Sequence, residues 1–194
     1  MTHRPTTSLA DYLAALAAAT PTPGGGSASG VTGAMGAALV EMVAGLPLAK
    51  GEGEHTAVQR TALDRARAAR SELLTLAEED ATAFTTFMEA LKLPKNSESE
   101  RAARTAALST AAQRAAEVPL ATLRATVAVA EAAKSITDRS LASAESDLAV
   151  AARFARAGGE SAAENVEANL PFIEGAEIRA TLAHQSWSVR NPQR

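Results

Sequence analysis

The side chains best suited to acid–base chemistry lie late in the chain. Asp147 follows Ser146 and precedes an apolar, helix-favouring stretch. A carboxylate there can accept or donate a proton, although an acid at such a place is more often a helix cap or a first-turn residue. Asn165 and Asn169 are four residues apart, so both amides lie on one face of a helix. They either bind a ligand or contact a neighbouring helix, and spacing alone favours the helix contact.

A glycine-rich turn could bind an anion. Gly24-Gly25-Gly26-Ser27 opens a predicted helix directly after Thr20-Pro21-Thr22-Pro23. Free N–H groups and the helix dipole attract negative charge at such a place. No strand precedes the turn and no Gly-Lys-Ser/Thr follows it, so it is neither a dinucleotide fingerprint nor a P-loop. The pattern alone predicts a binding turn or a flexible one, and favours the flexible one.

Several classes of function are excluded by composition. The three histidines are not spaced as metal ligands and there is no cysteine, so no metal site, disulfide or thiolate chemistry is expected. The net charge of −3 provides no basic field for nucleic acid. Residues 1–9 lack the apolar core of a signal peptide, and no run approaches the roughly 20 apolar residues of a membrane span. We therefore expect a cytoplasmic protein with no membrane partner.

The elements that position these residues are predicted to be helices. Hydrophobic residues make up 46% of the 194 residues, mostly as alanine, and aromatics only 3%, which favours helix over strand. Pro119 either kinks a helix or starts the next, and Gly158-Gly159 interrupts or ends another. The predicted helices span residues 8–19, 27–46, 54–91, 97–118, 119–135, 147–157, 160–170 and 174–185, before a polar tail at about 186–194. The pattern indicates one all-α domain over 1–194, an antiparallel up-and-down bundle of long helices.

One predicted helix carries a face of glycines. Gly30, Gly33 and Gly36 recur every third residue, and each costs roughly 1 kcal/mol of helix stability against alanine. Something must approach that face closely, either another helix or a flat ligand. A core of small side chains also buries little area per residue, so we expect a homodimer.

Motifs along nearly the whole chain resemble, in order, those of one family. The resemblance is to the cyclodeaminase/cyclohydrolase family, which includes the C-terminal domain of formiminotransferase-cyclodeaminase and free-standing methenyltetrahydrofolate cyclohydrolases. The matching segments are Thr20–Ser27, Gly33–Leu39 with Met42-Val43, Glu79-Asp80 with Ala83-Phe84, Leu93-Pro94-Lys95, Ala116–Leu120, Ser146-Asp147-Leu148 with Val150-Ala151, Asn165-Val166 and Asn169-Leu170.

The resemblance implies a homodimeric helical bundle that binds a reduced folate and needs no further cofactor. It implies hydrolysis of 5,10-methenyltetrahydrofolate to 10-formyltetrahydrofolate, with cyclodeamination of formimidoyltetrahydrofolate as the alternative. Asp147 is then the catalytic acid or base. Lys95 would meet the glutamate tail of the folate as a point charge. The remaining substrate-binding candidates are Gly24, Gly25, Gly26, Ser27, Asp80, Asn165 and Asn169.

Three departures from the family pattern keep a third alternative open. The segment Ala49–Glu54 lacks an expected aromatic residue, and Asp138–Leu141 lacks an asparagine before the Ser-Asp pair. Polar side chains also replace small or apolar ones at Glu160, Ser161 and Glu164. These changes motivate a catalytically inactive dimer that binds folate or a protein. Asp80 itself lies beside two glutamates, and a solvated acidic helix face is the simpler interpretation of that cluster.

Overall fold

The protein is an all-α bundle, as the sequence predicts. A computed structural model describes residues 8–191, and this part of the chain contains helices and no strand. The α-helices are α1 (Leu9–Leu16), α2 (Gly25–Leu48), α3 (Thr56–Leu91), α4 (Glu98–Ser135), α5 (Glu145–Asn169) and α6 (Ala176–Arg190). Short 3-10 turns at Ala142–Ala144 and Leu170–Phe172 precede and follow α5.

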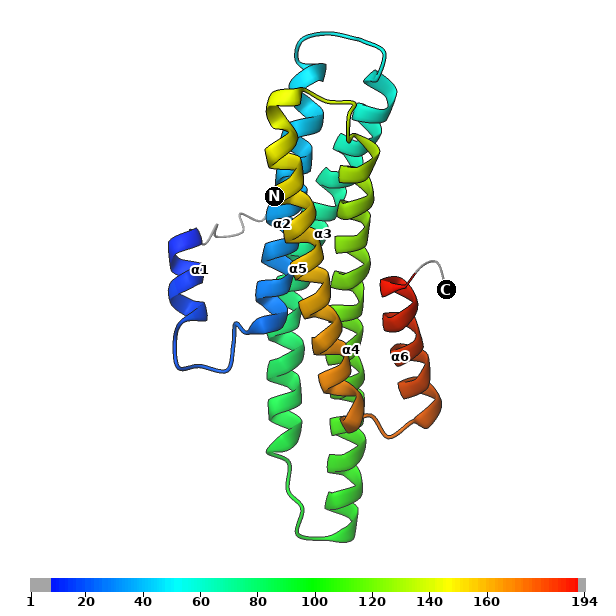
Figure 1. The fold of residues 1–194 in the computed structure, drawn as a ribbon. Helices are drawn as coiled ribbons and strands as arrows, with labels where there is room; N and C mark the ends of the chain where they lie inside the picture. Colours follow the sequence, from blue (N-terminus) through cyan, green and yellow to red (C-terminus); the bar gives the residue numbers. More distant parts are fainter. Residues whose placement is uncertain (1–7, 192–194) are drawn as a thin grey trace, which may run out of the picture.

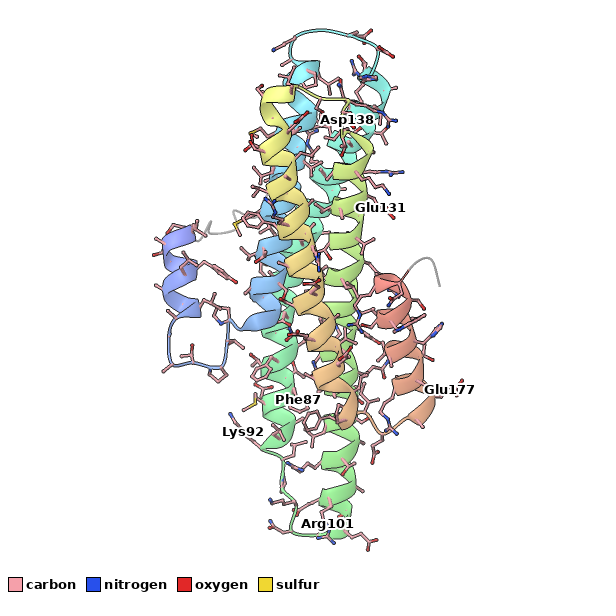
Figure 2. The ribbon with its side chains drawn as sticks, viewed as in Figure 1. Phe87, Lys92, Arg101, Glu131, Asp138 and Glu177 are labelled. Carbon is pink, nitrogen blue, oxygen red and sulfur yellow. The ribbon has the colours of Figure 1, made fainter. Side chains whose placement is uncertain are left out.

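Four helices, α2 to α5, form an up-and-down bundle (Figure 1). Helix α2 packs against α3 and α5, and α4 packs against the same two helices. Helices α3 and α4 contain 36 and 38 residues, so each is about 55 Å long. Helices α1 and α6 lie outside this bundle on opposite sides of it. The charged side chains of Lys92 and Arg101 lie at the far lower end (Figure 2).

The glycine face of α2 is explained by neighbouring helices. A Cβ atom at Gly30 would lie 2.8 Å from the carbonyl oxygen of Leu73 on α3. A Cβ atom at Gly36 would lie 2.9 Å from the carbonyl oxygen of Ala151 on α5. Both separations are closer than side chains tolerate, so the glycines allow backbones to touch. For these positions a neighbouring helix, and not a flat ligand, is the correct interpretation.

Of the two alternatives for Pro119, the start of a new helix is wrong, and the predicted break at Gly158-Gly159 is wrong as well. Helix α4 continues through Pro119, and α5 continues through Gly158-Gly159. Pro119 has no N–H for the carbonyl of Ala115 one turn earlier. The side-chain amide of Asn169 on α5 donates to that carbonyl instead, at 3.0 Å. Gly158 is needed where α5 meets α2, because a Cβ atom there would lie 2.8 Å from the carbonyl oxygen of Ser29.

Helix ends agree with the sequence less closely. The capping box of Ser97 and Glu100 is present at the start of α4. The expected first helix is shorter than predicted and ends at Leu16. The polar tail expected from about residue 186 is helical as far as Arg190. The prediction that residues 1–9 lack a signal peptide concerns a segment that lies mainly outside the described residues.

Helix α2 is long and apolar enough to cross a membrane by length and composition alone. The prediction that no segment is long and apolar enough to span a membrane is therefore wrong for α2. Much of α2 is nevertheless buried among α3, α4 and α5, with Val40, Val43 and Ala44 almost fully enclosed. A core helix of a bundle has this composition for packing reasons alone.

Candidate active site

A cavity of about 160 Å³ lies where all four bundle helices meet near the start of α2. Its wall includes a segment that precedes the bundle, through Pro21 and Thr22. The bundle residues lining it are Gly24, Gly25 and Gly26 of α2, Asp80 and Phe84 of α3, Ala115 of α4, and Asn165 and Asn169 of α5. The structure therefore brings six predicted site residues, from three separate helices, around one cavity.

Asp80 is the ionisable group in this cavity. Its side chain is half-buried, and burial raises the pKa of its carboxyl, while a hydrogen bond from the backbone N–H of Ser27 acts in the opposite direction. The carboxylate lies against the α-carbon of Gly26, where any Cβ atom would overlap it. A partly desolvated carboxylate beside a helix N-terminus can exchange protons at a higher pH than a surface carboxylate can. The solvated acidic face expected for this position is therefore wrong for Asp80 itself.

The two asparagines differ in what holds them. The side-chain amide of Asn169 donates hydrogen bonds to the carbonyls of Ala115 and Asn165. Asn165 donates to the carbonyl of Ser161 within its own helix, at 2.8 Å. Its amide nitrogen also lies 3.9 Å from where a Cβ atom of Gly25 would be. Asn169 thus makes the predicted helix contact while still lining the cavity, and Asn165 lies beside the glycine turn.

Ser27 supports the cavity from behind. It is 3% exposed and does not line the cavity, but its backbone N–H bonds to Asp80. Its hydroxyl shares a hydrogen bond of 3.2 Å with the hydroxyl of Tyr12 on α1. Ser27 therefore contacts Asp80 through its backbone and Tyr12 through its side chain, and it does not line the cavity.

Phe84 was not singled out as a site residue by sequence. It lies one helical turn after Asp80, lines the cavity and is 38% exposed. Because aromatics are only 3% of the chain, an exposed ring beside a carboxylate is the signal that could have identified it. A flat heterocycle can stack on such a ring.

Two predicted residues do not reach the cavity within one chain. Asp147 lies in the first turn of α5 and precedes Asn165 by 18 residues, a rise of about 27 Å along the helix. The expectation that it faces the cavity near the asparagines is therefore wrong for a single subunit. Lys95 lies in the exposed turn beyond the end of α3, where its carbonyl accepts a hydrogen bond from Arg101. Neither residue lines a cavity with the glycine turn.

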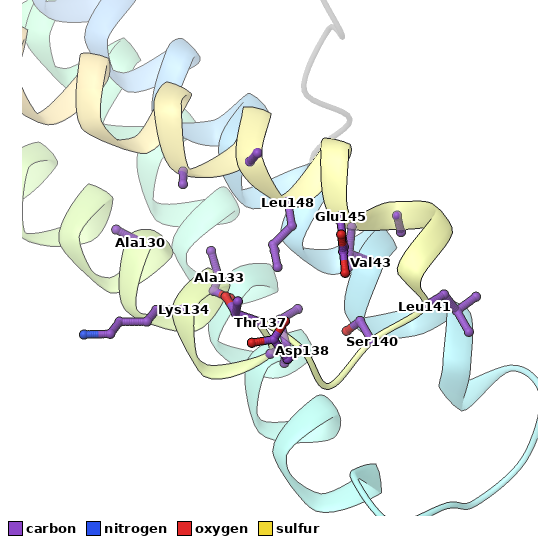
Figure 3. A pocket seen from close by; sticks show the side chains of 14 residues that line it. Val43, Ala130, Ala133, Lys134, Thr137, Asp138, Ser140, Leu141, Glu145 and Leu148 are labelled. Carbon is purple, nitrogen blue, oxygen red and sulfur yellow. The ribbon is translucent and has the colours of Figure 1, made fainter.

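A larger cavity, of about 420 Å³, lies where the end of α4 leads into α5 (Figure 3). Its lining includes the apolar side chains of Val43 and Leu148 and three charged residues, Lys134, Asp138 and Glu145. None of the predicted site residues lines it. The smaller cavity is the candidate active site because the predicted residues converge there around the Asp80 carboxyl, whose pKa is raised by burial. Among the described residues no group of three or more His, Cys, Asp or Glu could hold a metal ion.

Comparisons with known proteins point to one family. Residues 8–187 match the family model of formiminotransferase-cyclodeaminase. A methenyltetrahydrofolate cyclohydrolase from Methylorubrum extorquens is 39% identical over 164 residues, covering 84% of this chain and 79% of that protein. The pig formimidoyltransferase-cyclodeaminase is 32% identical over 188 residues, but this chain spans only 34% of its length.

A solved structure shares the fold. The formiminotetrahydrofolate cyclodeaminase of Thermotoga maritima superposes with a TM-score of 0.84 at 29% sequence identity. The match covers 95% of this chain and 89% of that one.

Proposed function

This chain belongs to the formiminotransferase-cyclodeaminase family, and we propose that it hydrolyses 5,10-methenyltetrahydrofolate to 10-formyltetrahydrofolate. The observation that carries the proposal is the half-buried Asp80 carboxyl beside the glycine turn of α2. The relative named as a cyclohydrolase is 39% identical to this chain, whereas the pig formimidoyltransferase-cyclodeaminase is 32% identical and the cyclodeaminase of Thermotoga maritima 29%. The higher identity favours the hydrolytic reaction.

The reaction adds water to the cationic carbon that bridges two folate nitrogens. Asp80 accepts a proton from the attacking water as the new C–O bond forms. The C–N bond to the pterin nitrogen then breaks, and Asp80 returns that proton to the departing nitrogen. One further proton, from the new hydroxyl, is released to solvent, so the cation and water become the neutral formyl product. While ionised, the same carboxylate stabilises the substrate cation.

The other cavity residues would hold the substrate. The pterin ring would stack on Phe84, which presents an exposed ring one turn from Asp80. Asn165 would bind the pterin or the tetrahedral intermediate through its side-chain oxygen, since its nitrogen bonds to Ser161. Lys95 lies four residues beyond Leu91, the last residue of α3, and Leu91 is 11 residues past Asp80, a rise of about 16 Å along the helix. At that distance it would meet only the glutamate tail of an extended folate.

We also propose that the protein is a homodimer formed through α2. Three large apolar side chains on the outer face of α2 are substantially exposed: Met35 at 40%, Met42 at 42% and Leu46 at 39%. Their spacing of seven and four residues places them in one stripe. A second copy of the chain would cover this stripe in an isologous contact. Replacing Met42 by glutamate should then shift the protein to monomers in sedimentation, whereas an unchanged sedimentation rate would contradict this interface.

A dimer of this kind gives Asp147 a place in the reaction. One turn after it, Ala151 packs against Gly36 near the middle of α2, so Asp147 lies alongside the later half of α2. Antiparallel pairing of two α2 helices would bring Asp147 of the partner subunit toward the glycine turn of the first. The catalytic role predicted for Asp147 would then be exercised across the interface.

Cyclodeamination is the second candidate, because the structure from Thermotoga maritima that shares this fold is named as a cyclodeaminase. The same carboxyl would then protonate the departing ammonia. Ultraviolet absorbance separates the two reactions, since the methenyl chromophore is lost on hydrolysis and gained on cyclodeamination. Loss of chromophore well above the spontaneous rate supports hydrolysis, and gain from formimidoyltetrahydrofolate supports cyclodeamination. No change with either substrate would favour the third alternative, a catalytically inactive dimer that binds folate or a protein.

A cytoplasmic location and independence of any further cofactor are part of the same proposal.

A further inference from the structure

Helix α1 stands away from the bundle (Figure 1). None of its residues is buried, and Leu9 and Leu13 are 61% and 52% exposed. Within residues 8–191, its one side-chain hydrogen bond to the bundle joins Tyr12 to Ser27, with 3.2 Å between their hydroxyl oxygens. Tyr12 is half-buried, unlike its neighbours on either side. The tyrosine is therefore the principal attachment of α1.

The partner of Tyr12 is next to the reactive group. Ser27 is 3% exposed, and its backbone N–H donates to the carboxylate of Asp80. The Tyr12 hydroxyl, Ser27 and Asp80 thus form a chain of contacts that joins α1, α2 and α3. Ser27 alone stands between the Tyr12 hydroxyl and the Asp80 carboxylate in this chain of contacts.

The first turn of α2 is buried but lacks a side-chain cap. Its cap residue, Gly24, makes no side-chain capping bond, and two further glycines follow it. The segment from α1 to α2 supplies Pro21 and Thr22 to the wall of the cavity. The segment that follows α1 therefore forms part of that wall and leads directly into the start of α2.

The cavity is too small for the substrate as it stands. Its volume is about 160 Å³, whereas pockets that enclose ligands of drug size measure about 300 to 1,000 Å³. Within one subunit, a reduced folate can be enclosed only if a wall moves. The wall with the fewest packing contacts is the one attached to α1.

Building on the proposed function, we propose that Tyr12 is a positioning residue of the Asp80 site. Its hydroxyl, acting through Ser27, holds the first turn of α2 against Asp80 and latches residues 17–23 as a movable wall of the cavity. The latch opens to admit the folate and closes to orient the carboxyl. Tyr12 itself need not touch the substrate.

The test compares Tyr12→Phe, Ser27→Ala and the double variant with the unaltered protein. Thr85→Val is a matched control, because it removes a hydroxyl that bonds only to Ala81 within α3, outside the cavity. A neutral hydrogen bond contributes about 0.5 to 1.5 kcal/mol, so Tyr12→Phe should lower kcat/KM by about twofold to tenfold. The double variant should be no worse than Ser27→Ala alone, because both changes break the same link.

The pH dependence of kcat/KM distinguishes the proposed role from a general loss of folded protein, because unfolding lowers the amount of active enzyme without shifting the pH profile of the remainder. The N–H of Ser27 lowers the pKa of Asp80, so loosening it should raise that pKa. The acid limb of kcat/KM should therefore shift to higher pH in Tyr12→Phe and stay in place in Thr85→Val. An unshifted limb, or effects of Tyr12→Phe and Ser27→Ala that simply add, would overturn the proposal.

Hydrogen exchange keeps this test independent of catalysis. In the free protein, Tyr12→Phe should accelerate amide exchange across residues 24–28, and Thr85→Val should not. Unchanged exchange at these residues contradicts the latch even if the enzyme is fully active. If the unaltered protein turns over neither folate, the proposed function fails while faster exchange in Tyr12→Phe would still support the latch.

Discussion

The carboxylate of Asp80 lies directly against the α-carbon of Gly26, so that even a methyl group at Gly26 would overlap it. This contact joins the middle of α3 to the first turn of α2 and places a carboxyl where helix N–H groups face it. The contact explains why the last residue of the glycine run must be glycine, whether or not the turn is flexible. The last glycine of the run makes room for a side chain that can transfer protons.

Gly26→Ala should therefore displace Asp80 and remove activity. Overpacking of this kind costs about 1 to 3 kcal/mol, so the melting temperature should fall as well. Gly45→Ala is a suitable control, because nothing lies within 4 Å of a Cβ atom there and Gly45 is also in α2. The control should be neutral or stabilise by up to about 1 kcal/mol. Full activity in Gly26→Ala would show that the contact is not needed.

Asp80→Asn should stabilise the free protein at neutral pH. Burial raises the pKa of Asp80 in the folded state above its usual value, so between the unfolded and folded pKa values the folded state holds more protons. Stability then falls as pH rises through this window, and the penalty is complete above the folded pKa. The gain in melting temperature from Asp80→Asn should be largest at neutral pH and shrink as pH falls through the folded pKa.

The control for this measurement is Asp64→Asn, an exposed position on the same helix. It should leave the melting temperature nearly unchanged across the same pH range. A gain in Asp80→Asn that grows toward acid pH would contradict the burial of this carboxyl.

Asn169 should stabilise the fold in addition to lining the cavity. Pro119 leaves the buried carbonyl of Ala115 without its helical donor, and Asn169 supplies one. Asn169→Ala should therefore cost about 1 to 3 kcal/mol of unfolding free energy. Adding Pro119→Ala restores an N–H, so the double variant should be less destabilised than Asn169→Ala. Chemical denaturation of the four proteins completes the cycle, and strict additivity would show that the two residues are not coupled.

Mixed dimers test whether Asp147 acts across the interface. Asp80→Asn and Asp147→Asn homodimers should each be nearly inactive. Random exchange of subunits makes about half the dimers mixed, each with one intact composite site, so about a quarter of normal activity should return. No recovery after confirmed exchange would mean that the two carboxylates do not share a site across subunits. A fully active Asp147→Asn homodimer would remove Asp147 from the mechanism altogether.

Sequence patterns predicted the bundle well because they are local. The long helix before Leu91 follows from uninterrupted helix-forming residues, and the cap at Ser97 from its side-chain hydrogen bonds. The new helix predicted at Pro119 and the break predicted at Gly158 are wrong because the contacts that allow each helix to continue come from other helices. Asn169 supplies the hydrogen-bond donor that Pro119 lacks, and Gly158 allows α5 to pack closely against α2.

The site was predictable only as a set of candidates. The glycine turn and the asparagines could be identified from spacing and family resemblance. The burial of Asp80 could not, because it depends on contact with Gly26, 54 residues earlier in the chain. Phe84 and Tyr12 were missed for the same reason, since their roles arise from neighbours on other helices.

The most direct test of the central claim is the rate at which methenyltetrahydrofolate absorbance is lost with unaltered protein and with Asp80→Asn. The unaltered protein should remove the chromophore well above the spontaneous rate. Because a general base contributes a factor of about 10² to 10⁴, Asp80→Asn should slow the reaction by that range while keeping its fold by circular dichroism. An unaltered protein no faster than buffer, or an Asp80→Asn variant as fast as the unaltered protein, would contradict the assignment of Asp80 as the base of a folate cyclohydrolase.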